Sequence, residues 1–307
     1  MAPKLDLKRL VLGACAFGLL AAGAAGAPAF AGPADDPANW RKIDPENLLV
    51  MTIKEQQVLV ELRPDFAPKH VEQIKKIVRD GNWDKLPFHR VIDDFMAQGG
   101  ETYAIYQIYP HYGTLKAEFT FGRKPKTQPV KIIGKTAEGD QLGYLDGFMV
   151  QGQPDAVAAI SDPAVAKTWA LHCSGIASMA RTSDPDSAET QFFLMRHPRV
   201  GPKEDGGLDA EYTIWGRALT GIEAIRSIKA GVEADNGVLS PGVADKLSKV
   251  VVAADMKPHL KPTVYVERTD GPAFASKLAA VTVPAPTTPL DACGLPSPEV
   301  VVERPTP

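Results

Sequence analysis

The sequence lacks any block of basic residues, and its net charge is −3. A mildly acidic chain argues against nucleic acid or an anionic membrane surface as its main partner. Beyond the N-terminal region, no run approaches the roughly 20 apolar residues that a membrane-spanning helix requires. The six histidines are scattered, with no ligand pair at helical or turn spacing, so no metal site is predicted. The content of 44% hydrophobic and 23% charged residues is ordinary for a soluble globular protein.

Residues 1–31 are typical of an export signal. They combine a basic start, an apolar segment over residues 10–25 and small residues up to Ala31. We therefore predict cleavage near Ala31 and a periplasmic location. Two alternatives stay open. One is an uncleaved membrane anchor, although the apolar run is short and rich in Ala and Gly; the other is a lipoprotein acylated at Cys15, although few apolar residues precede this cysteine.

The rest of the chain divides by composition into three parts. Residues 32–47 are rich in Pro, Asp and Ala and predict a linker or a frayed start. Residues 48–270 carry the apolar patterns of a folded domain. Residues 271–307 are rich in Pro and Thr, which favours an extended C-terminal tail over a packed core.

Short apolar runs in the central part predict strands, and two amphipathic stretches predict helices. The runs at 48–53 and 57–62, parted by three polar residues, indicate a hairpin. Residues 67–79 place their apolar side chains on one stripe after a proline in the first turn, and residues 221–230 show a similar stripe, so both predict helices. Further strands are expected at 175–180, 191–195, 212–216, 249–253 and 264–266.

Signal cleavage would leave two cysteines, Cys173 and Cys293. In an oxidising compartment an even pair favours one disulfide, which would pin the C-terminal tail to the domain. The alternative is two unpaired thiols, since bridging depends on the separation of the Cα atoms.

Residues 87–100 contain an unusual arginine. Two apolar runs parted by an Asp-Asp pair predict a β-hairpin with an acidic turn. Because residues two apart on a strand point to the same side, Phe88, Arg90 and Ile92 should share one face. A guanidinium between apolar neighbours needs a reason, because it cannot lose its charge on burial. The simplest reason would be an arginine that snorkels at the rim of a sheet.

Two later stretches complete a pattern. Ser-Met-Ala-Arg at 178–181 is followed by Gln-Phe-Phe-Leu at 191–194, and a third motif occupies 208–216. In this order the three stretches resemble a cyclophilin-type peptidyl-prolyl cis-trans isomerase. The likeness covers residues 48 to about 255. It implies a mainly β fold, with a closed eight-stranded antiparallel β-barrel capped by two α-helices.

The residue types in these stretches also limit the chemistry. They include one cation, two amides and three large apolar side chains: Arg90, Gln98, Gln191, Phe95, Met96 and Phe193. This set holds no nucleophile with a neighbouring base, no paired carboxylates and no phosphate-binding glycine loop, which excludes most covalent and acid–base mechanisms. What remains is an apolar pocket rimmed by hydrogen-bond donors, suited to gripping an apolar group beside a peptide bond.

The resemblance implies a role for each position. Arg90 corresponds to the guanidinium that stabilises the twisted X-Pro bond, and Gln98 is assigned as the second catalytic residue. Substrate binding is assigned to Phe95, Met96, Ala180, Arg181, Gln191, Phe193, Leu208 and Tyr212. Ala180 and Arg181 stand where the family has Ala-Asn, and the contact there is largely through the backbone.

The sequence departs from the family in several places. Gly207 stands where many relatives carry an aromatic residue, so one wall of the pocket is expected to be open. Tyr212 replaces the His of animal members, and Glu101 replaces the usual Asp. The segment of about 101–172 is longer than in compact members. Such an insertion would be a lid, a partner surface or inert decoration.

The predicted function is therefore a peptidyl-prolyl isomerase that assists the folding of exported proteins. Its partners would be proline-containing polypeptides, and we expect a monomer with no cofactor, no nucleic acid and no membrane span after cleavage. No assigned catalytic group titrates between about pH 6 and 9, so activity should change little there. The alternative is a cyclophilin-like peptide-binding or chaperone module of the cell envelope with weak or absent turnover, favoured by Gly207 and by the insertion.

Overall fold

The computed structural model describes residues 32–101, 112–281 and 285–305. The predicted export signal at 1–31, with Cys15, lies outside the described residues. Within the described part the chain is mainly β, with few helices. No helix in that part is both long and apolar enough to span a bilayer.

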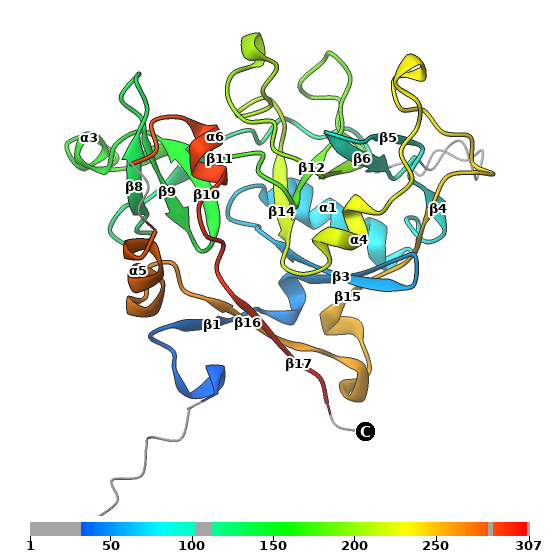
Figure 1. The fold of residues 1–307 in the computed structure, drawn as a ribbon, viewed down its shortest axis with the longest axis horizontal. Coiled ribbons are helices and arrows are strands. Elements are labelled where there is room, and N and C mark those ends of the chain that lie inside the picture. Colours follow the sequence, from blue (N-terminus) through cyan, green and yellow to red (C-terminus); the bar gives the residue numbers. More distant parts are fainter. Residues whose placement is uncertain (1–31, 102–111, 282–284, 306–307) are drawn as a thin grey trace, which may run out of the picture. The chain divides into compact units, whose positions relative to one another are not determined.

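The largest element is a curled antiparallel sheet of nine strands, called here the main sheet (Figure 1). Its strand order is β4-β15-β2-β3-β14-β12-β13-β6-β5. In chain order these strands are β2 (Leu48–Ile53), β3 (Gln56–Leu62), β4 (Leu86–Pro87), β5 (Arg90–Ile92), β6 (Met96–Gly99), β12 (Ile176–Met179), β13 (Phe192–Met195), β14 (Ile214–Ala218) and β15 (Lys246–Val252). The predicted hairpin at 48–53 and 57–62 is confirmed as β2 and β3.

The sheet is an open half-barrel, whereas the sequence led us to expect a closed eight-stranded barrel. Its two edge strands are β4 and β5. Only Phe88 and His89 separate these strands, and strand pairing is interrupted there. The same interruption corrects a second prediction. Phe88 does not share a face with Arg90; it packs with Val91 in the core enclosed by the main sheet, because the alternation of a continuous strand is broken.

Strand β2 shows how the main sheet is buried on both faces. Leu49, Met51 and Ile53 point into the enclosed core. Leu48 and Val50 point the other way, into a separate apolar cluster. An uninterrupted apolar run is therefore what the position of this strand requires.

Helices α1 (Pro68–Arg79) and α4 (Ile222–Arg226) close the core of the main sheet. Val71, Ile74 and Ile77 of α1 are fully or almost fully buried there, as is Ile225 of α4. The helix predicted at 67–79 is confirmed, and its proline lies in the first turn, where no backbone donor is needed. The helix predicted at 221–230 is shorter than expected.

Residues 121–170 form a second sheet of five strands in the order β7-β11-β10-β9-β8 (Figure 1). Its elements are β7 (Phe121–Arg123), β8 (Lys131–Lys135), β9 (Gln141–Leu145), β10 (Phe148–Gly152), α3 (Asp155–Ala159) and β11 (Ala166–Ala170). The sheet lies within the predicted insertion of about 101–172, of which residues 102–111 are outside the described residues. Phe148 and Val150 of β10 pack with Phe193 and Met195 of the main sheet.

The N-terminal and C-terminal segments together build a third sheet, in the order β1-β16-β17. Its strands and the adjoining helices are β1 (Trp40–Lys42), β16 (Thr263–Glu267), α5 (Pro272–Ala279), α6 (Pro289–Cys293) and β17 (Val300–Glu303). Single turns of 3₁₀ helix occupy Pro33–Asp35, Pro45–Asn47, Lys203–Asp205, Glu233–Asp235, Ala253–Asp255 and Pro258–Leu260.

Two predictions about these segments are wrong. Residues 32–47, expected to be a linker or frayed start, contribute strand β1. The segment after residue 271, expected to be extended, contains two helices and a strand and buries Phe274. Its prolines misled the interpretation because two of them, Pro272 and Pro289, stand in the first turns of helices, where proline is favourable.

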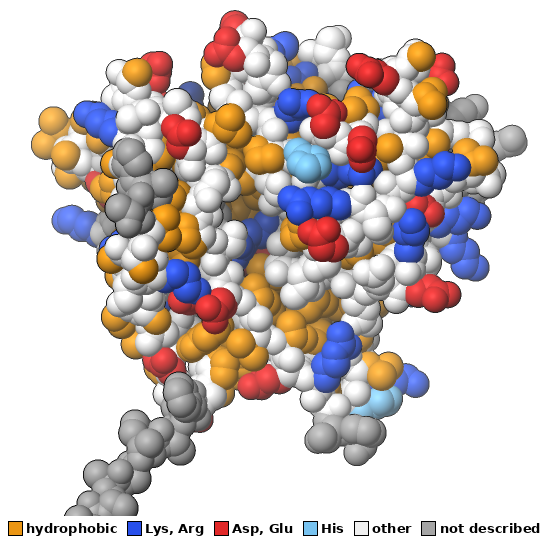
Figure 2. Space-filling model, in the orientation of Figure 1, with side chains coloured by type: hydrophobic (Ala, Val, Ile, Leu, Met, Phe, Trp, Pro, Cys, Tyr) orange, Lys and Arg blue, Asp and Glu red, His pale blue; other side chains and the backbone are white. Residues whose placement is uncertain are grey.

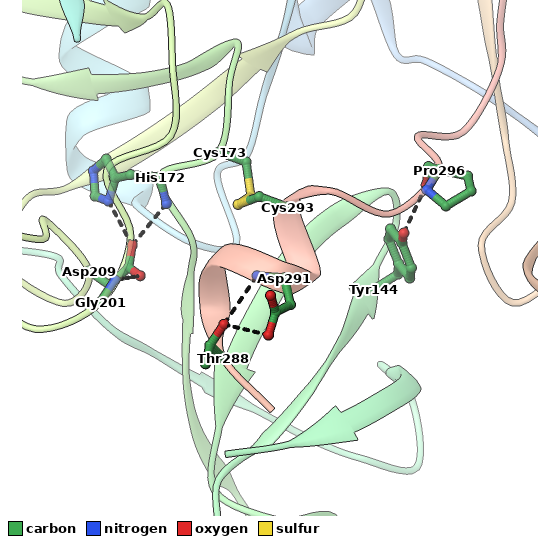
Figure 3. Close-up of a disulfide and its surroundings, with 9 residues drawn as sticks. All are labelled: Tyr144, His172, Cys173, Gly201, Asp209, Thr288, Asp291, Cys293 and Pro296. Carbon is green, nitrogen blue, oxygen red and sulfur yellow. Dashed lines mark hydrogen bonds and ion pairs between the residues drawn. A yellow bond between two sulfur atoms is a disulfide. The ribbon is translucent and has the colours of Figure 1, made fainter. Parts of the chain in front are cut away.

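The predicted disulfide is confirmed. Cys173 and Cys293 are bonded, with their Cα atoms 5.4 Å apart, and the bridge ties α6 to the segment before β12 (Figure 3).

Candidate functional site

A cavity of about 280 Å³, called here the Arg90 pocket, gathers most of the predicted site residues. Nine of the ten line it: Arg90, Phe95, Met96, Gln98, Ala180, Arg181, Phe193, Leu208 and Tyr212. The tenth, Gln191, does not line the cavity but accepts a hydrogen bond from Gln98. Arg199 and Gly206 also line the cavity and were missed from the sequence.

The apolar floor of the pocket follows from strand alternation. On β13, Phe192 points into the core enclosed by the main sheet and packs against Trp83. Its neighbour Phe193 points to the opposite side, where the pocket lies. Strand β6 pairs with β13 so that Gln98 stands opposite Phe193 and Met96 opposite Met195. The register thus sets an amide and a thioether beside the Phe193 ring.

Arg90 is held at the mouth of the pocket from two sides. Its Nη1 donates to Oε1 of Gln98, its cross-strand partner, at 3.3 Å. Its Nε and Nη2 donate to the backbone oxygen and the Oδ1 of Asn236, each at 3.0 Å. Gly237 allows this approach, since a Cβ atom there would lie 2.6 Å from the carbonyl oxygen of Val91. The sequence shows Asn236-Gly237 as a turn signal, but nothing in it indicates a contact 146 residues away.

A chain of amides continues from the arginine. Gln98 donates through Nε2 to Oε1 of Gln191 at 2.8 Å. Gln191 in turn donates to the carboxylate of Glu101. Because the carboxylate can only accept, it fixes the direction of both amides and leaves the Gln98 oxygen facing the guanidinium. Gln191 therefore orients Gln98 from behind the pocket wall.

The far wall is a stack of aromatic and cationic groups. The Tyr212 ring meets the Phe193 ring edge to face, with centroids 5.5 Å apart. The guanidinium of Arg181 lies 4.5 Å from the centre of the Tyr212 ring. Nε and Nη2 of Arg181 donate to the backbone oxygen and the carboxylate of Glu211, at 3.0 and 3.1 Å. These contacts make Arg181 a support for the ring wall.

The loop over residues 199–208 closes the remaining side, and it corrects the prediction for Gly207. The guanidinium of Arg199 lies 5.4 Å from the centre of the Phe95 ring. Gly206 lines the pocket, whereas Gly207 is buried away from it. A Cβ atom at residue 207 would lie 2.1 Å from the carbonyl oxygen of Gly201. An aromatic side chain therefore has no room there, and the glycine marks a close backbone approach.

A buried hydrogen-bonded trio lies beneath the floor. The ring of His172 stacks under Phe193, with centroids 6.2 Å apart. Its Nε2 lies 3.0 Å from Oγ of Ser178. Its Nδ1 lies 3.1 Å from Oδ1 of Asp209 (Figure 3). Asp209 also accepts from the backbone nitrogen of Gly201 at 2.7 Å. The residue types match a Ser-His-Asp triad, but all three are buried, so the trio holds the pocket floor to the loop over 199–208.

Two ionisable groups beside the pocket are shifted by their surroundings. Burial lowers the pKa of the Arg90 guanidinium, which nevertheless stays a cation at neutral pH because its ordinary value is so high. Burial also lowers the pKa of His89, so this imidazole is neutral above its ordinary value of about 6.5. Within residues 32–101, 112–281 and 285–305, no group of three or more His, Cys, Asp or Glu side chains is placed to hold a metal ion.

Comparisons with known proteins agree with this geometry. The family model described as cyclophilin type peptidyl-prolyl cis-trans isomerase/CLD matches residues 48–252. Probable peptidyl-prolyl cis-trans isomerases of Brucella suis biovar 1 and Brucella melitensis biotype 1 are each 34% identical over 215 residues, which cover 70% of this chain and 86% of theirs. The crystal structure of the cyclophilin AquaCyp293 from Hirschia baltica is 35% identical, with a TM-score of 0.77 and coverage of 89% of this chain and 96% of that one.

Proposed function

This chain belongs to the cyclophilin-type peptidyl-prolyl cis-trans isomerase family, and on that premise we propose that it isomerises X-Pro bonds in the Arg90 pocket. The observation that carries the proposal is the position of one fixed guanidinium at the mouth of an apolar cavity floored by Met96 and Phe193. A proline ring fits an apolar floor of this kind, while the preceding peptide group remains within reach of the rim.

The energetics need no covalent step. Rotation about X-Pro is slow because amide resonance must be broken, with an activation energy of about 20 kcal/mol. In the twisted state the prolyl nitrogen regains a lone pair, and a catalyst needs only to bind that state more tightly than the planar one. Each tenfold of rate takes about 1.4 kcal/mol of such preference. One hydrogen bond from a charged donor, at about 1.5–3 kcal/mol, is of the right size.

Arg90 has donors left for this task. A guanidinium carries five N–H groups, and the bonds to Gln98 and Asn236 use three of them within the described residues. The bonded donors fix the plane of the group before substrate arrives. We assign the stabilising hydrogen bond to the second N–H of an Arg90 Nη atom, and the backbone contacts of the substrate to Gln98.

A coupled-protease assay on a proline-containing peptide tests the assignment. We expect Arg90→Ala to lower kcat/KM by about 10- to 100-fold, which corresponds to one charge-assisted hydrogen bond. Arg217→Met is the control, since it removes a different arginine of the main sheet, one that does not line the pocket. Wild-type activity in Arg90→Ala would refute the role, provided that both variants keep the unfolding temperature of the parent to within a few degrees.

The rival function, a peptide-binding or chaperone module with weak turnover, loses one of its two supports. It was favoured by an open wall at Gly207, and this residue is buried against Gly201. Peptide binding without isomerisation in the same assay would favour the module. Isomerisation that disappears with Arg90 would favour the enzyme.

We further propose that the chain acts on exported proteins as a periplasmic monomer. The signal-like composition of residues 1–31 supports export, and the disulfide between Cys173 and Cys293 is the kind of bond that persists in an oxidising compartment. The mass of the protein recovered from a periplasmic extract tests the first point. Cleavage after Ala31 is expected, and a mass that includes a lipid on Cys15 would contradict it.

Closure of the main sheet into an eight-stranded barrel also belongs to the proposal. Its support is that β4 and β5 lie on one stretch of chain and flank the sheet on its two edges. The backbone nitrogen of Phe88 donates to Asp245, and His89 accepts from Leu239, so hydrogen bonds also continue across the gap. Slow amide exchange at these positions would support closure.

A further inference from the structure

Arg217 is a largely buried cation that lacks a hydrogen-bond partner. It lies on β14, and its side chain is 11% exposed. Among the described residues, neither its Nε nor its Nη2 atom meets an acceptor. The nearest carboxylate oxygen is Oε2 of Glu61, 3.7 Å from Nε, which is too far for a hydrogen bond. The contact is an ion pair without a hydrogen bond, and buried N–H groups that lack an acceptor are costly, so their persistence calls for a reason.

The neighbouring carboxylates are already engaged by other arginines. Both oxygens of Glu61 accept from Arg41, at 2.7 and 2.8 Å. Both oxygens of Asp65 accept from Arg63, which also donates to Asp146. Arg217 therefore shares Glu61 with Arg41 and makes no hydrogen bond to it. Burial beside the other two arginines lowers its pKa to about 10, which still leaves it charged at neutral pH.

A cavity of about 290 Å³ opens beside this guanidinium. It is lined by Arg217 and, further along, Arg226, but most of its wall is apolar, with Ile176, Leu219 and Leu295 among the lining residues. In Figure 2, cationic side-chain atoms are visible in the hollow between the second sheet and the main sheet. Of the described residues, none lines both this Arg217 cavity and the Arg90 pocket.

The outer wall of the cavity is fastened in place. It is formed by the segment 292–300, called here the C-terminal strap. The disulfide between Cys173 and Cys293 holds one end, and the hydroxyl of Tyr144 donates to the backbone oxygen of Pro296 at 2.8 Å (Figure 3). The other end continues into β17, which pairs with β16. The cavity is thus preformed, as ligand sites usually are.

We propose that the Arg217 cavity binds an apolar carboxylate, with the carboxylate on Arg217 and the hydrocarbon body along the apolar wall. A carboxylate matches the fork of a guanidinium and would supply the partner that Glu61 does not. Arg226 already donates to Glu223 and to the backbone oxygen of Arg196, so it contributes charge at the far end more than a free fork. Two sources share this chemistry: a free fatty acid, and the terminal carboxylate of a chain that ends in an apolar residue.

Calorimetric titration of the disulfide-bonded protein with octanoate is the first test. Octanol is the matched neutral probe, because it has the same body without the charge. We expect octanoate to bind at least tenfold more tightly than octanol. Equal affinities, or no binding of octanoate, would overturn the proposal, and this comparison needs no variant that must fold.

Arg217→Met is the second test. It should lower octanoate affinity at least tenfold and leave that for octanol unchanged, whereas Arg226→Gln should lower octanoate affinity less than threefold. Unchanged octanoate affinity in Arg217→Met would refute the site. The substitution removes buried N–H groups that lack an acceptor together with a long ion pair to Glu61, so the unfolding temperature without octanoate should stay within a few degrees of the parent, and isomerase activity should not change.

A third titration separates the two sources. A short peptide that ends in leucine is compared as the free acid and as the C-terminal amide. Binding of octanoate alone identifies a fatty acid as the ligand class, and binding of the peptide acid but not the amide identifies a chain terminus. If neither carboxylate binds, the proposal fails whatever the outcome of the isomerase assay.

Discussion

The two arginine sites of this protein are built in opposite ways. Arg90 lies on a hairpin, and its main-sheet partner Gln98 is eight residues away. Its guanidinium is bonded on two sides and stands at the mouth of its pocket. Arg217 lies on the same sheet, but its cavity is also lined by residues of β12, α4, the second sheet and the C-terminal strap. That guanidinium is left without a hydrogen bond in the described part of the chain.

The contrast shows what each site is prepared to do. Pre-bonded donors fix the Arg90 guanidinium in direction, which suits a group that must favour one short-lived geometry over another. A guanidinium with N–H groups that lack an acceptor, beside a largely apolar cavity, instead suits a ligand that brings its own charge and stays bound. The following changes should separate the two sites.

Loss of the disulfide should have the largest effect, and only at the Arg217 cavity. Cys293→Ser opens a cross-link between residues separated by 120 positions. We expect unfolding free energy to fall by about 2–4 kcal/mol, measured by denaturant titration. Octanoate affinity should fall as well, because the strap loses an anchor, while kcat/KM for the peptide stays within twofold. An equal loss of isomerase activity would mean that the two sites are not independent.

Replacing each arginine by lysine should have the second-largest effect and should again distinguish the two sites. Lysine keeps the charge but lacks the fork, so Arg90→Lys cannot hold both Gln98 and Asn236 while donating to substrate. We expect kcat/KM to fall about tenfold or more, the equivalent of at least 1.4 kcal/mol. Arg217→Lys should leave kcat/KM unchanged and weaken the binding of octanoate. The assignment of Arg90 is contradicted if lysine restores full activity.

A smaller effect is expected from Gln191→Leu, which cuts the amide chain behind the pocket. Gln98 would lose the acceptor that fixes its direction, and the loss of one neutral hydrogen bond is worth about 1 kcal/mol. We expect kcat/KM to fall about threefold to tenfold, with Asn236→Ala as a companion that frees the opposite side of Arg90. If Gln191→Leu raises KM alone, the residue binds substrate directly and does not act through Gln98.

The contents of the Arg90 pocket could be predicted because its residues lie in three motifs with recognisable spacing. Strand alternation and register then bring them together, as for Phe193 and Gln98. Asn236 and Arg199 could not be found in this way, since each lies on a loop outside the three motifs. Gly207 misled the interpretation because a missing side chain was taken for an open wall, and only the packing against Gly201 reveals the opposite.

The C-terminal segment was misread for a related reason. Composition rich in proline favours an extended chain when nothing else is known. The actual positions of Pro272 and Pro289, at helix starts, and the bond of Cys293 to Cys173 decide the structure instead. The Arg217 cavity depends on contacts between distant segments, which no local pattern encodes, whereas the second sheet pairs mainly consecutive strands that the sequence analysis did not predict.

The smallest effect should be that of pH on catalysis. Stability should depend on pH, whereas activity should not. Arg90 remains charged, and burial lowers the pKa of His89, so neither group changes state between about pH 6.5 and 9. Because the folded protein disfavours the protonated imidazole, the contribution of His89 to stability is complete above its unfolded pKa of about 6.5 and is lost as pH falls through the lowered folded value.

Burial alone would raise the pKa values of Glu61 and Glu118, but both are lowered. Arg41 and Arg217 lower the pKa of Glu61. Hydrogen bonds with His70 and with the neighbouring backbone lower the pKa of Glu118. Their contribution is present above the unfolded value of about 4.5 and disappears below it. Unfolding free energy should therefore decline in two stages on acidification, and His89→Gln should remove the first stage and keep the second. A flat kcat/KM from about pH 6.5 to 9 is expected throughout, and a bell-shaped profile in that range would show that a titrating group takes part in catalysis.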